Sequence, residues 1–248
     1  MCFGQVSHVL LDAVGTLIYP SPSVGEVYQQ AAADQGLHLP LPEVKGRFSQ
    51  AYKSIAYPAA ATSDAADRLR WQQVVSAVFP ELFPVAQQAT FETLWHHFEQ
   101  PSAWKLFEDA QRLLKKLQTS QYITAVASNF DARLHTILQG HTELAWIPYR
   151  FISSEVGAPK PHPTFFASAA NQLGVDSNQL LLVGDDYEAD VLGGIAAGLH
   201  VAWLQRDPLA ASESEAAIAK LRKYLPSQNQ LTVIFKLEDL WKSILTID

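Results

Sequence analysis

Three short apolar runs, each ending in polar residues, constrain the fold of this chain more than any other feature. They are VSHVLLD (6–12), YITAVASN (122–129) and QLLLVGDD (179–186). Nearly continuous apolar character over so few residues is typical of a parallel strand that is covered on both faces. HVAWLQ (200–205) and TVIF (232–235) predict two further strands.

Helical patterns lie between these runs. EDAQRLLKKLQ (108–118) precedes the second run, PTFFASAANQLG (163–174) precedes the third, and EADVLGGIAAG (188–198) follows it. Strands that alternate with helices along the chain indicate an α/β fold with a doubly wound, Rossmann-like parallel sheet.

The region 20–102 has a different pattern. It contains amphipathic helical segments separated by Pro and Gly, and it shows no convincing strand. Because a single strand at 6–12 is not a stable unit by itself, we interpret this region as an all-helical domain inserted into the sheet domain. The predicted domains are therefore 1–19 with 103–248 for the core, and 20–102 for the helical insertion.

Composition excludes several classes of protein. With 48% hydrophobic and 17% charged residues, the 248-residue chain can bury a substantial core. Its net charge of -7 argues against a nucleic-acid partner. No stretch approaches the roughly 18 apolar residues of a membrane helix, and the N-terminus lacks the features of a signal peptide. Cys2 is the only cysteine, which fits a reducing compartment, so we expect a soluble, cytoplasmic protein with no membrane partner.

The polar residues that end the apolar runs are the candidate functional residues. In an open parallel sheet, ligands bind at the carboxyl ends of the strands, so these residues are expected to converge. They are Asp12 after the first run, Ser128 and Asn129 at the end of the second, and Asp185 and Asp186 at the end of the third, with Asp190 one helical turn further and Lys160 in the segment GAPKPHP.

These residue types form a chemically consistent set. Two carboxylates, Asp12 and Asp185, can hold Mg²⁺, which prefers oxygen ligands and bridges to phosphate. The hydroxyl and amide groups of Ser128 and Asn129 can bind phosphate oxygens, and Lys160 can neutralise charge in the transition state. Asp12 can then attack phosphorus and form an aspartyl phosphate.

Four segments together resemble the motifs of the haloacid dehalogenase superfamily. They are DAVGTL (12–17), SNF (128–130), KPHP (160–163) and GDDYEAD (184–190), present in that order and spanning the predicted core. The helical insertion resembles the C1-type cap of subfamily I, which closes over the site and selects the substrate. The phrases VGEVYQQAAADQGL, RFSQAYKS and SNFDARL resemble the branch of haloacid dehalogenase-like hydrolase domain-containing protein 3 and the rhythmically expressed gene product.

The resemblance implies a role for each matching residue. Asp12 is the implied nucleophile and a Mg²⁺ ligand, together with the backbone carbonyl of Val14 and the carboxylate of Asp185. Thr16, Ser128 and Lys160 are expected to contact the transferring group, and Ser128 and Lys160 to take part in catalysis. Asp186 or Asp190 is expected to support the residues that bind the metal without binding the metal itself. The expected substrate is a small phosphorylated molecule.

Val14 departs from the pattern, because phosphatases of this family usually have an aspartate there that serves as general acid and base. Four interpretations follow: a slow phosphatase, a 2-haloacid dehalogenase, a phosphonatase-like enzyme using Lys53, or a binding or regulatory protein with the same fold. Dehalogenases also lack the second aspartate, but Asp185 argues against that alternative. General acid–base catalysis contributes about 10²–10⁴-fold to a reaction rate, so turnover depends on which group replaces the missing aspartate.

Substrate choice is expected to depend on cap residues. The candidates are Arg47, Tyr52, Lys53 and Arg70, and helical periodicity does not distinguish among them. The sequence predicts neither the identity of the substrate nor an oligomeric state.

Overall fold

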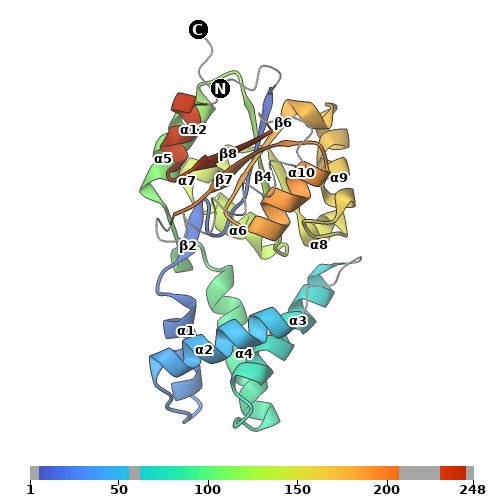
Figure 1. Cartoon of the computed structure of the whole chain (residues 1–248). Helices are drawn as coiled ribbons and strands as arrows, with labels where there is room; N and C mark the ends of the chain where they lie inside the picture. Colours follow the sequence, from blue (N-terminus) through green and yellow to red (C-terminus); the bar gives the residue numbers. More distant parts are fainter. Residues whose placement is uncertain (1–5, 56–61, 207–229, 244–248) are drawn as a thin grey trace.

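The core of the molecule is a six-stranded parallel sheet (Figure 1). The computed structural model describes residues 6–55, 62–206 and 230–243, so Cys2 lies outside the described residues. The strand order is β5-β4-β1-β6-β7-β8. The strands are β1 (His8–Leu11), β4 (Ile123–Ser128), β5 (Tyr149–Ile152), β6 (Leu180–Gly184), β7 (His200–Leu204) and β8 (Leu231–Ile234). The predicted doubly wound α/β fold is confirmed.

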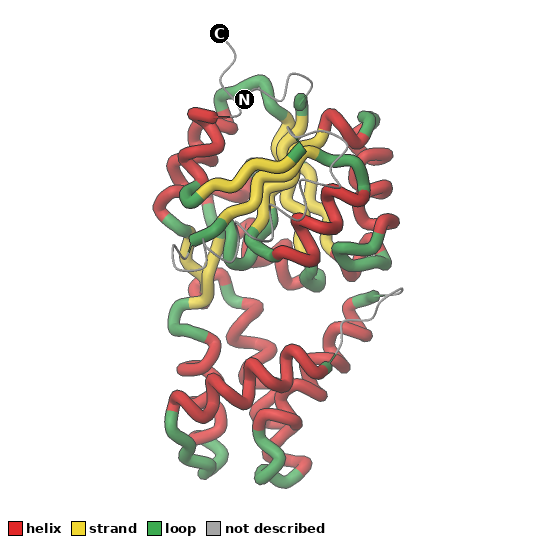
Figure 2. The backbone as a smooth tube through the Cα atoms, in the orientation of Figure 1, coloured by secondary structure: helices red, strands yellow, loops and turns green. Residues whose placement is uncertain are grey.

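Helices cover both faces of this sheet, as Figure 2 shows. One face carries α5 (Glu108–Gln118), α6 (Arg133–Gln139), α7 (Thr142–Ala145) and α12 (Leu237–Ser243). The other carries α8 (Ser153–Val156), α9 (Pro163–Leu173), the π-helix η3 (Tyr187–Leu192) and α10 (Gly193–Ala196). Short 3₁₀ turns, η1 (Pro101–Ala103) and η2 (Ser177–Gln179), precede β3 (Trp104–Leu106) and β6.

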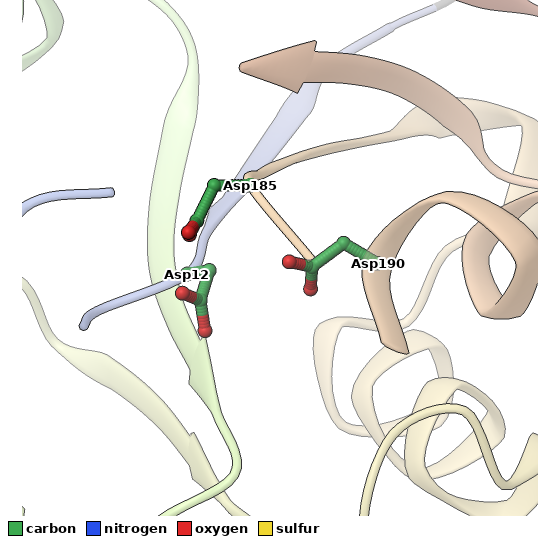
Figure 3. Close-up of side chains that lie close together, drawn as sticks. All are labelled: Asp12, Asp185 and Asp190. Carbon is green, nitrogen blue, oxygen red and sulfur yellow. The ribbon is translucent and has the colours of Figure 1, made fainter. Parts of the chain in front are cut away.

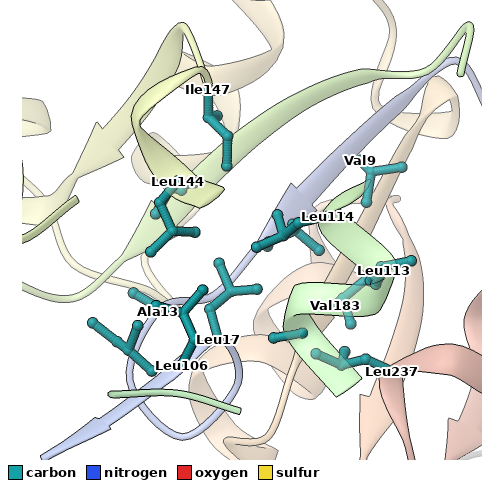
Figure 4. Close-up of a cluster of buried hydrophobic side chains, with 14 of the residues drawn as sticks. Val9, Ala13, Leu17, Leu106, Leu113, Leu114, Leu144, Ile147, Val183 and Leu237 are labelled. Carbon is teal, nitrogen blue, oxygen red and sulfur yellow. The ribbon is translucent and has the colours of Figure 1, made fainter. Parts of the chain in front are cut away.

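The two faces are filled by alternate residues of the central strand. Val9 and Leu11 of β1 belong to the cluster that packs against Leu113 and Leu114 of α5 (Figure 4), whereas Leu10 belongs to the cluster of α9. All three β1 side chains are fully buried. Burial of such a side chain contributes about 1.5–3 kcal/mol, so β1 is held firmly at the centre of the sheet. The residue that follows it is Asp12.

The helical region consists of α1 (Val24–Ala33), α2 (Leu41–Ser54), α3 (Asp64–Val78) and α4 (Pro84–Glu99). Start signals in the sequence explain their beginnings: a proline occupies the first turn of α2 and of α4, and the Ser63 side chain accepts a hydrogen bond from the backbone N–H of Ala66 at the start of α3. The four helices enclose a hydrophobic cluster of their own. Between residues 24 and 99 the described segments contain no strand, as expected.

A two-stranded antiparallel ribbon joins the helical region to the core. It consists of β2 (Ile18–Pro20) and β3 (Trp104–Leu106), and it was not predicted because each strand has only three residues. The ribbon brings the chain's exit to α1 and its return from α4 side by side. Of the boundaries proposed from the sequence, residue 20 is the last residue of β2 and residue 102 lies just before β3; the division into domains stays a prediction.

One strand of the main sheet was also not expected. β5 lies at the sheet edge, and its sequence YRFI carries the exposed Tyr149 and the half-buried Arg150, so it lacks the apolar run of the other strands.

Among the described helices, none is long and apolar enough to cross a membrane.

Candidate active site

The predicted site residues converge at the carboxyl ends of three adjacent strands. Asp12 directly follows β1, Ser128 is the last residue of β4, and Asp185 directly follows β6. Since β4, β1 and β6 are neighbours in the sheet, the three side chains lie at one edge. This is where ligands bind in open parallel sheets.

Three carboxylates approach one another there. Asp12, Asp185 and Asp190 each offer an oxygen, and these oxygens all lie within 4.8 Å of one another (Figure 3). We call these residues the acidic cluster. Asp12 and Asp190 are buried, and Asp185 is partly buried. Carboxylates held so close repel one another unless positive charge is placed between them.

Lys160 supplies one positive charge to this cluster. Its ammonium group donates to Asp12 Oδ1 at 2.8 Å, to Asp190 Oδ1 at 2.6 Å and to the carbonyl of Ala127 at 2.8 Å. These bonds use all three N–H donors of the side chain. Lys160 is 3% exposed, so its position is fixed. The Pro-bounded segment predicted to place Lys160 in the site therefore does so.

The electrostatic balance of the site favours an added cation. If all three carboxylates are ionised, they and the one ammonium group carry a net charge of about -2, a state that burial opposes in the metal-free site and that a bound cation would stabilise. Burial raises the pKa of Asp12 to about 8, and the negative charges of Asp190 and Asp185 act in the same direction, against the attraction of Lys160. Burial also raises the pKa of Asp185. Burial disfavours the charge of Lys160, but the attraction of Asp12 and Asp190 outweighs this and raises its pKa.

The donor set fits Mg²⁺. Hard oxygen ligands from Asp12 and Asp185, at the open end of the sheet, are the kind that this ion binds, and its double positive charge matches the deficit of the cluster. The carboxylate of Asp190 is already used. Its Oδ1 accepts from Lys160, and its Oδ2 accepts from the backbone N–H of Asp186 at 3.1 Å. Asp190 therefore positions Lys160 and the loop after β6.

The turn after Asp12 is shaped by Gly15. Its φ of +91° lies in the region that favours glycine, and a Cβ there would lie 2.4 Å from Asp185 Oδ2. The next residue, Thr16, is fully buried and donates from Oγ1 to Asp185 Oδ1 at 2.9 Å. Val14 is 36% exposed. The turn thus brings its backbone close to Asp185 while the Val14 side chain stays accessible.

Two residues expected to contact the substrate have other partners in the structure. Thr16 orients Asp185, as described above. The Asn129 side chain donates to the carbonyl of Lys160 at 2.8 Å and accepts from its backbone N–H at 2.7 Å. These contacts show that both side chains hold other site residues in place, and the substrate contacts expected of them stay predictions. No hydrogen bond joins the Ser128 hydroxyl to another described residue, so it can donate to a ligand.

Asp186 has a structural role. Its side chain accepts a hydrogen bond at 2.7 Å from the backbone N–H of Ala189 and caps η3. Of the two residues expected to act from behind the metal ligands, Asp190 is the one whose carboxylate lies among them.

Arg206 is a site residue that the sequence analysis missed. It follows β7, and its guanidinium donates to the carbonyls of Gly15 at 3.0 Å and Thr16 at 2.7 Å. Its third nitrogen pairs with Asp109 at 3.1 Å, and its plane lies 3.6 Å from the centre of the Phe107 ring. Arg206 therefore holds the turn that carries Val14. Its place just after the run 200–205 could have identified it, because the rule on carboxyl ends applies to that strand too.

A parallel sheet with an aspartate after its central strand, a lysine bonded to it and a helical insertion in the first crossover defines a hydrolase of the haloacid dehalogenase type. A family model described as haloacid dehalogenase-like hydrolase matches residues 6–198, so the chain belongs to this family.

Individual relatives agree with this assignment. The chain is 31% identical over 207 residues to Haloacid dehalogenase-like hydrolase domain-containing protein 3 of Danio rerio, which covers 81% of this chain and 86% of the relative. The protein of that name from Mus musculus is 32% identical over 207 residues, and the matched region covers 79% of this chain and 80% of the mouse protein. The branch expected from the sequence is thereby confirmed. Among solved structures, the HAD-hydrolase YfnB from Bacillus subtilis, bound to magnesium, matches with a TM-score of 0.70 and 18% identity over 96% of this chain and 98% of that one.

Proposed function

We propose that this protein is a Mg²⁺-dependent phosphatase that hydrolyses a small phosphate monoester through an aspartyl phosphate on Asp12. The observation that carries the proposal is the hydrogen bond between Asp12 and Lys160 inside a cluster of three carboxylates with only one ammonium group. Such a site has a fixed nucleophile and a deficit of positive charge at the place where a phosphate would bind.

Asp12 and Asp185 would hold the metal through their carboxylates, with the backbone carbonyl of Val14 as a third protein ligand. Mg²⁺ neutralises the charge on the phosphate oxygens and aligns the ester with the nucleophile when it is bound. Thr16 and Arg206 support these ligands, because they fix Asp185 and the turn around Val14.

The first chemical step belongs to Asp12. One of its carboxylate oxygens bonds to phosphorus while the bond from phosphorus to the ester oxygen breaks, and the departing alkoxide takes a proton from water. Lys160 neutralises charge on the transferring group, and the Ser128 hydroxyl donates a hydrogen bond to one of its oxygens. The hydroxide formed in that proton transfer, or a water molecule that gives its proton to this hydroxide, then attacks phosphorus, which releases phosphate and restores the carboxylate.

Val14 limits this cycle, because its side chain can neither protonate the alkoxide nor activate the water. The expected result is slow turnover that depends strongly on how well the leaving group departs without a proton. An inactive or regulatory protein is the competing function, and the same residue supports it. Asp185 continues to argue against a 2-haloacid dehalogenase. Lys53, the residue of the phosphonatase alternative, is exposed on α2.

The test is phosphate release from a panel of phosphate monoesters, one of them with an activated leaving group, with Mg²⁺ and with a chelator. Asp12→Asn is the inactive variant, and Asp34→Asn, an exposed aspartate on the helical region, is the matched control. We expect Mg²⁺-dependent release that Asp12→Asn abolishes and Asp34→Asn leaves intact. Release that is equal in both variants, or that is absent from the wild type, would reject the proposal.

A further inference from the structure

Asp109 lies in the first turn of α5, on the sheet face where α5 and α12 pack together (Figure 1). It belongs to none of the four sequence motifs, and the proposed mechanism does not use it. The residue is 6% exposed although its side chain is a carboxylate. A buried carboxylate is stable only where hydrogen bonds and a positive charge replace the water that it loses, so its partners indicate its role.

Three hydrogen bonds meet on the Asp109 carboxylate. Nη1 of Arg206 donates to Oδ1 at 3.2 Å and to Oδ2 at 3.1 Å. The backbone N–H of Leu237 donates to Oδ2 at 2.9 Å. Arg206 follows β7 and Leu237 is the first residue of α12, so this carboxylate joins three segments that are far apart in the sequence.

The other nitrogens of Arg206 bond to the turn after β1. Its Nε donates to the carbonyl of Gly15 at 3.0 Å, and its Nη2 donates to the carbonyl of Thr16 at 2.7 Å. Thr16 donates in turn from Oγ1 to Asp185 Oδ1 at 2.9 Å. The bonds to Arg206 therefore connect Asp109 with one proposed metal ligand and with the turn that carries another.

The residue before α5 contacts the same turn. The backbone N–H of Phe107 donates to the carbonyl of Leu17 at 3.1 Å, and the Phe107 ring centre lies 3.6 Å from the guanidinium carbon of Arg206. The turn and the plane of the guanidinium are thus both fixed relative to the start of α5. Asp109 is only two residues further along the chain, so its carboxylate meets an arginine whose orientation is already restricted.

Asp109 also balances charge beside the acidic cluster. Arg206 carries a permanent positive charge, which would repel a cation at the adjacent turn if it were unpaired. The ion pair with Asp109 neutralises it, and both side chains are at least partly buried, so solvent screens this pair less than an exposed one. The negative charge of the acidic cluster then stays available to a metal ion.

We propose that Asp109 is a positioning residue of the metal site, which holds Arg206 on the turn that carries the carbonyl of Val14 and ties that turn to the start of α12. The part of this inference that concerns Mg²⁺ rests on the proposed phosphatase function. Because Mg²⁺ binding and the docking of α12 depend on the same carboxylate, each stabilises the other. The C-terminal helix is thereby linked to a metal site to which it contributes no ligand.

The first test is the Mg²⁺ dissociation constant of Asp109→Asn, measured by calorimetry. Asparagine has one acceptor oxygen, so in either orientation its amide nitrogen faces an N–H donor of Arg206 or of Leu237. Loss of a group that supports metal ligands typically costs about 10–100-fold in affinity. Asp109 acts one contact further out, so we expect binding to be about 3- to 10-fold weaker. An unchanged dissociation constant would overturn the proposal and leave the phosphatase function intact.

Glu238→Gln is the matched control. Glu238 of α12 pairs with Arg112 of α5 at 2.5 Å, so this ion pair joins the same two helices without involving Arg206. Both side chains are partly exposed, and α12 should stay docked without the pair. We expect the Mg²⁺ dissociation constant of Glu238→Gln to stay within about twofold of the wild type. Equal weakening by both variants would show that any change between these helices affects Mg²⁺ binding, and would overturn the role of Asp109.

A double variant tests whether Asp109 acts through Arg206. In Arg206→Met the guanidinium that Asp109 holds is absent, so adding Asp109→Asn should change the Mg²⁺ dissociation constant by less than about twofold. Thermal melting confirms that each variant is folded. If the two substitutions multiply as independent effects, Asp109 influences the metal site by another route and the proposal is wrong.

Hydrogen exchange of the wild type gives a readout that needs no substitution. Mg²⁺ should slow exchange of the Leu237 amide, which donates to Asp109, more than it slows the amides of α9 on the other face of the sheet. Equal slowing of both would contradict the link to α12. In the metal-free protein, Asp109→Asn should speed exchange of the Gly15 and Leu17 amides, which donate within the turn.

These measurements separate the two proposals. If the wild type neither hydrolyses an ester nor binds Mg²⁺, but Asp109→Asn speeds exchange in the turn and Glu238→Gln does not, the phosphatase function fails and the positioning role stands. If Asp109→Asn leaves exchange in the turn unchanged, the positioning role is wrong whatever the activity of the protein.

Discussion

Replacing Val14 by aspartate should turn a slow enzyme into a faster one. Val14 is 36% exposed in the turn that Gly15 and Arg206 hold, so a carboxylate there stays hydrated and adds no buried charge. The backbone carbonyl proposed as a metal ligand is unchanged by the substitution. Val14→Asp therefore adds a proton donor and acceptor two residues from Asp12 and removes nothing that the site uses.

The expected gain follows from the worth of a general acid–base group. Such a group contributes about 10²–10⁴-fold, which corresponds to about 2.7–5.4 kcal/mol of barrier at 1.36 kcal/mol per factor of ten. Because the turn was not selected to aim a carboxylate, we expect at least a tenfold rise in kcat. The gain should be largest for alkyl esters, whose alkoxides need a proton most, and smallest for an activated aryl ester.

The assay is steady-state phosphate release at saturating Mg²⁺ for an alkyl and an aryl ester. Val14→Asn is the matched control, since its amide has nearly the same shape but does not transfer a proton at neutral pH. The double variant with Asp12→Asn should be inactive. If Val14→Asp and Val14→Asn have the same kcat for the alkyl ester, the missing proton donor does not limit this enzyme and the reasoning is refuted.

Three further predictions concern the support of the site. Lys160→Met should lower the free energy of unfolding of the metal-free protein by about 3–5 kcal/mol in urea titrations, because it leaves buried carboxylates unpaired. Saturating Mg²⁺ should recover part of this lost stability. An unchanged urea midpoint would contradict the prediction. Arg206→Met should lower the free energy of unfolding by about 2 kcal/mol in the same measurement and weaken Mg²⁺ binding in calorimetry, since the carbonyls of Gly15 and Thr16 lose a charged donor. The control is Arg150→Met, at a half-buried arginine of β5. Equal effects from this variant would show that the loss of any arginine weakens folding and Mg²⁺ binding. Because the raised pKa of about 8 keeps Asp12 protonated in the folded, metal-free protein, its contribution to stability falls as pH rises from about 4 towards 8. Mg²⁺ must displace that proton, so the thermal shift it produces should be larger at pH 8.5 than at pH 6.5, and equal shifts would argue against Asp12 as a ligand.

The fold could be predicted from the sequence wherever burial on both faces made the strands continuous apolar runs. β1, β4, β6 and β7 satisfy this condition, and α5 and α9 follow their apolar periodicity closely. β5 was not predicted, because an edge strand that contains Tyr149 and Arg150 is not a continuous apolar run. The ribbon of β2 and β3 is too short for any periodicity, and its pairing joins segments more than 80 residues apart.

The site was predictable at the level of which residues meet, but less so at the level of what each one does. Strand ends converge by topology, so Asp12, Ser128 and Asp185 could be placed together. The direction in which Thr16 and Asn129 donate depends on partners 169 and 31 residues away, which no local pattern encodes. The same holds for Arg206, whose bond to Gly15 spans 191 residues.

The measurement that tests the central claim most directly is the mass of Asp12 during turnover. Wild-type protein is mixed with Mg²⁺ and an activated phosphate ester, quenched in acid and digested, and the peptide that contains Asp12 is analysed by mass spectrometry. Because Val14 cannot activate water, the covalent intermediate should accumulate, and the peptide should gain one phosphoryl group at Asp12 that is absent from Asp12→Asn. Phosphate release without any adduct at Asp12, or an adduct at another residue, would contradict the proposed role of this aspartate.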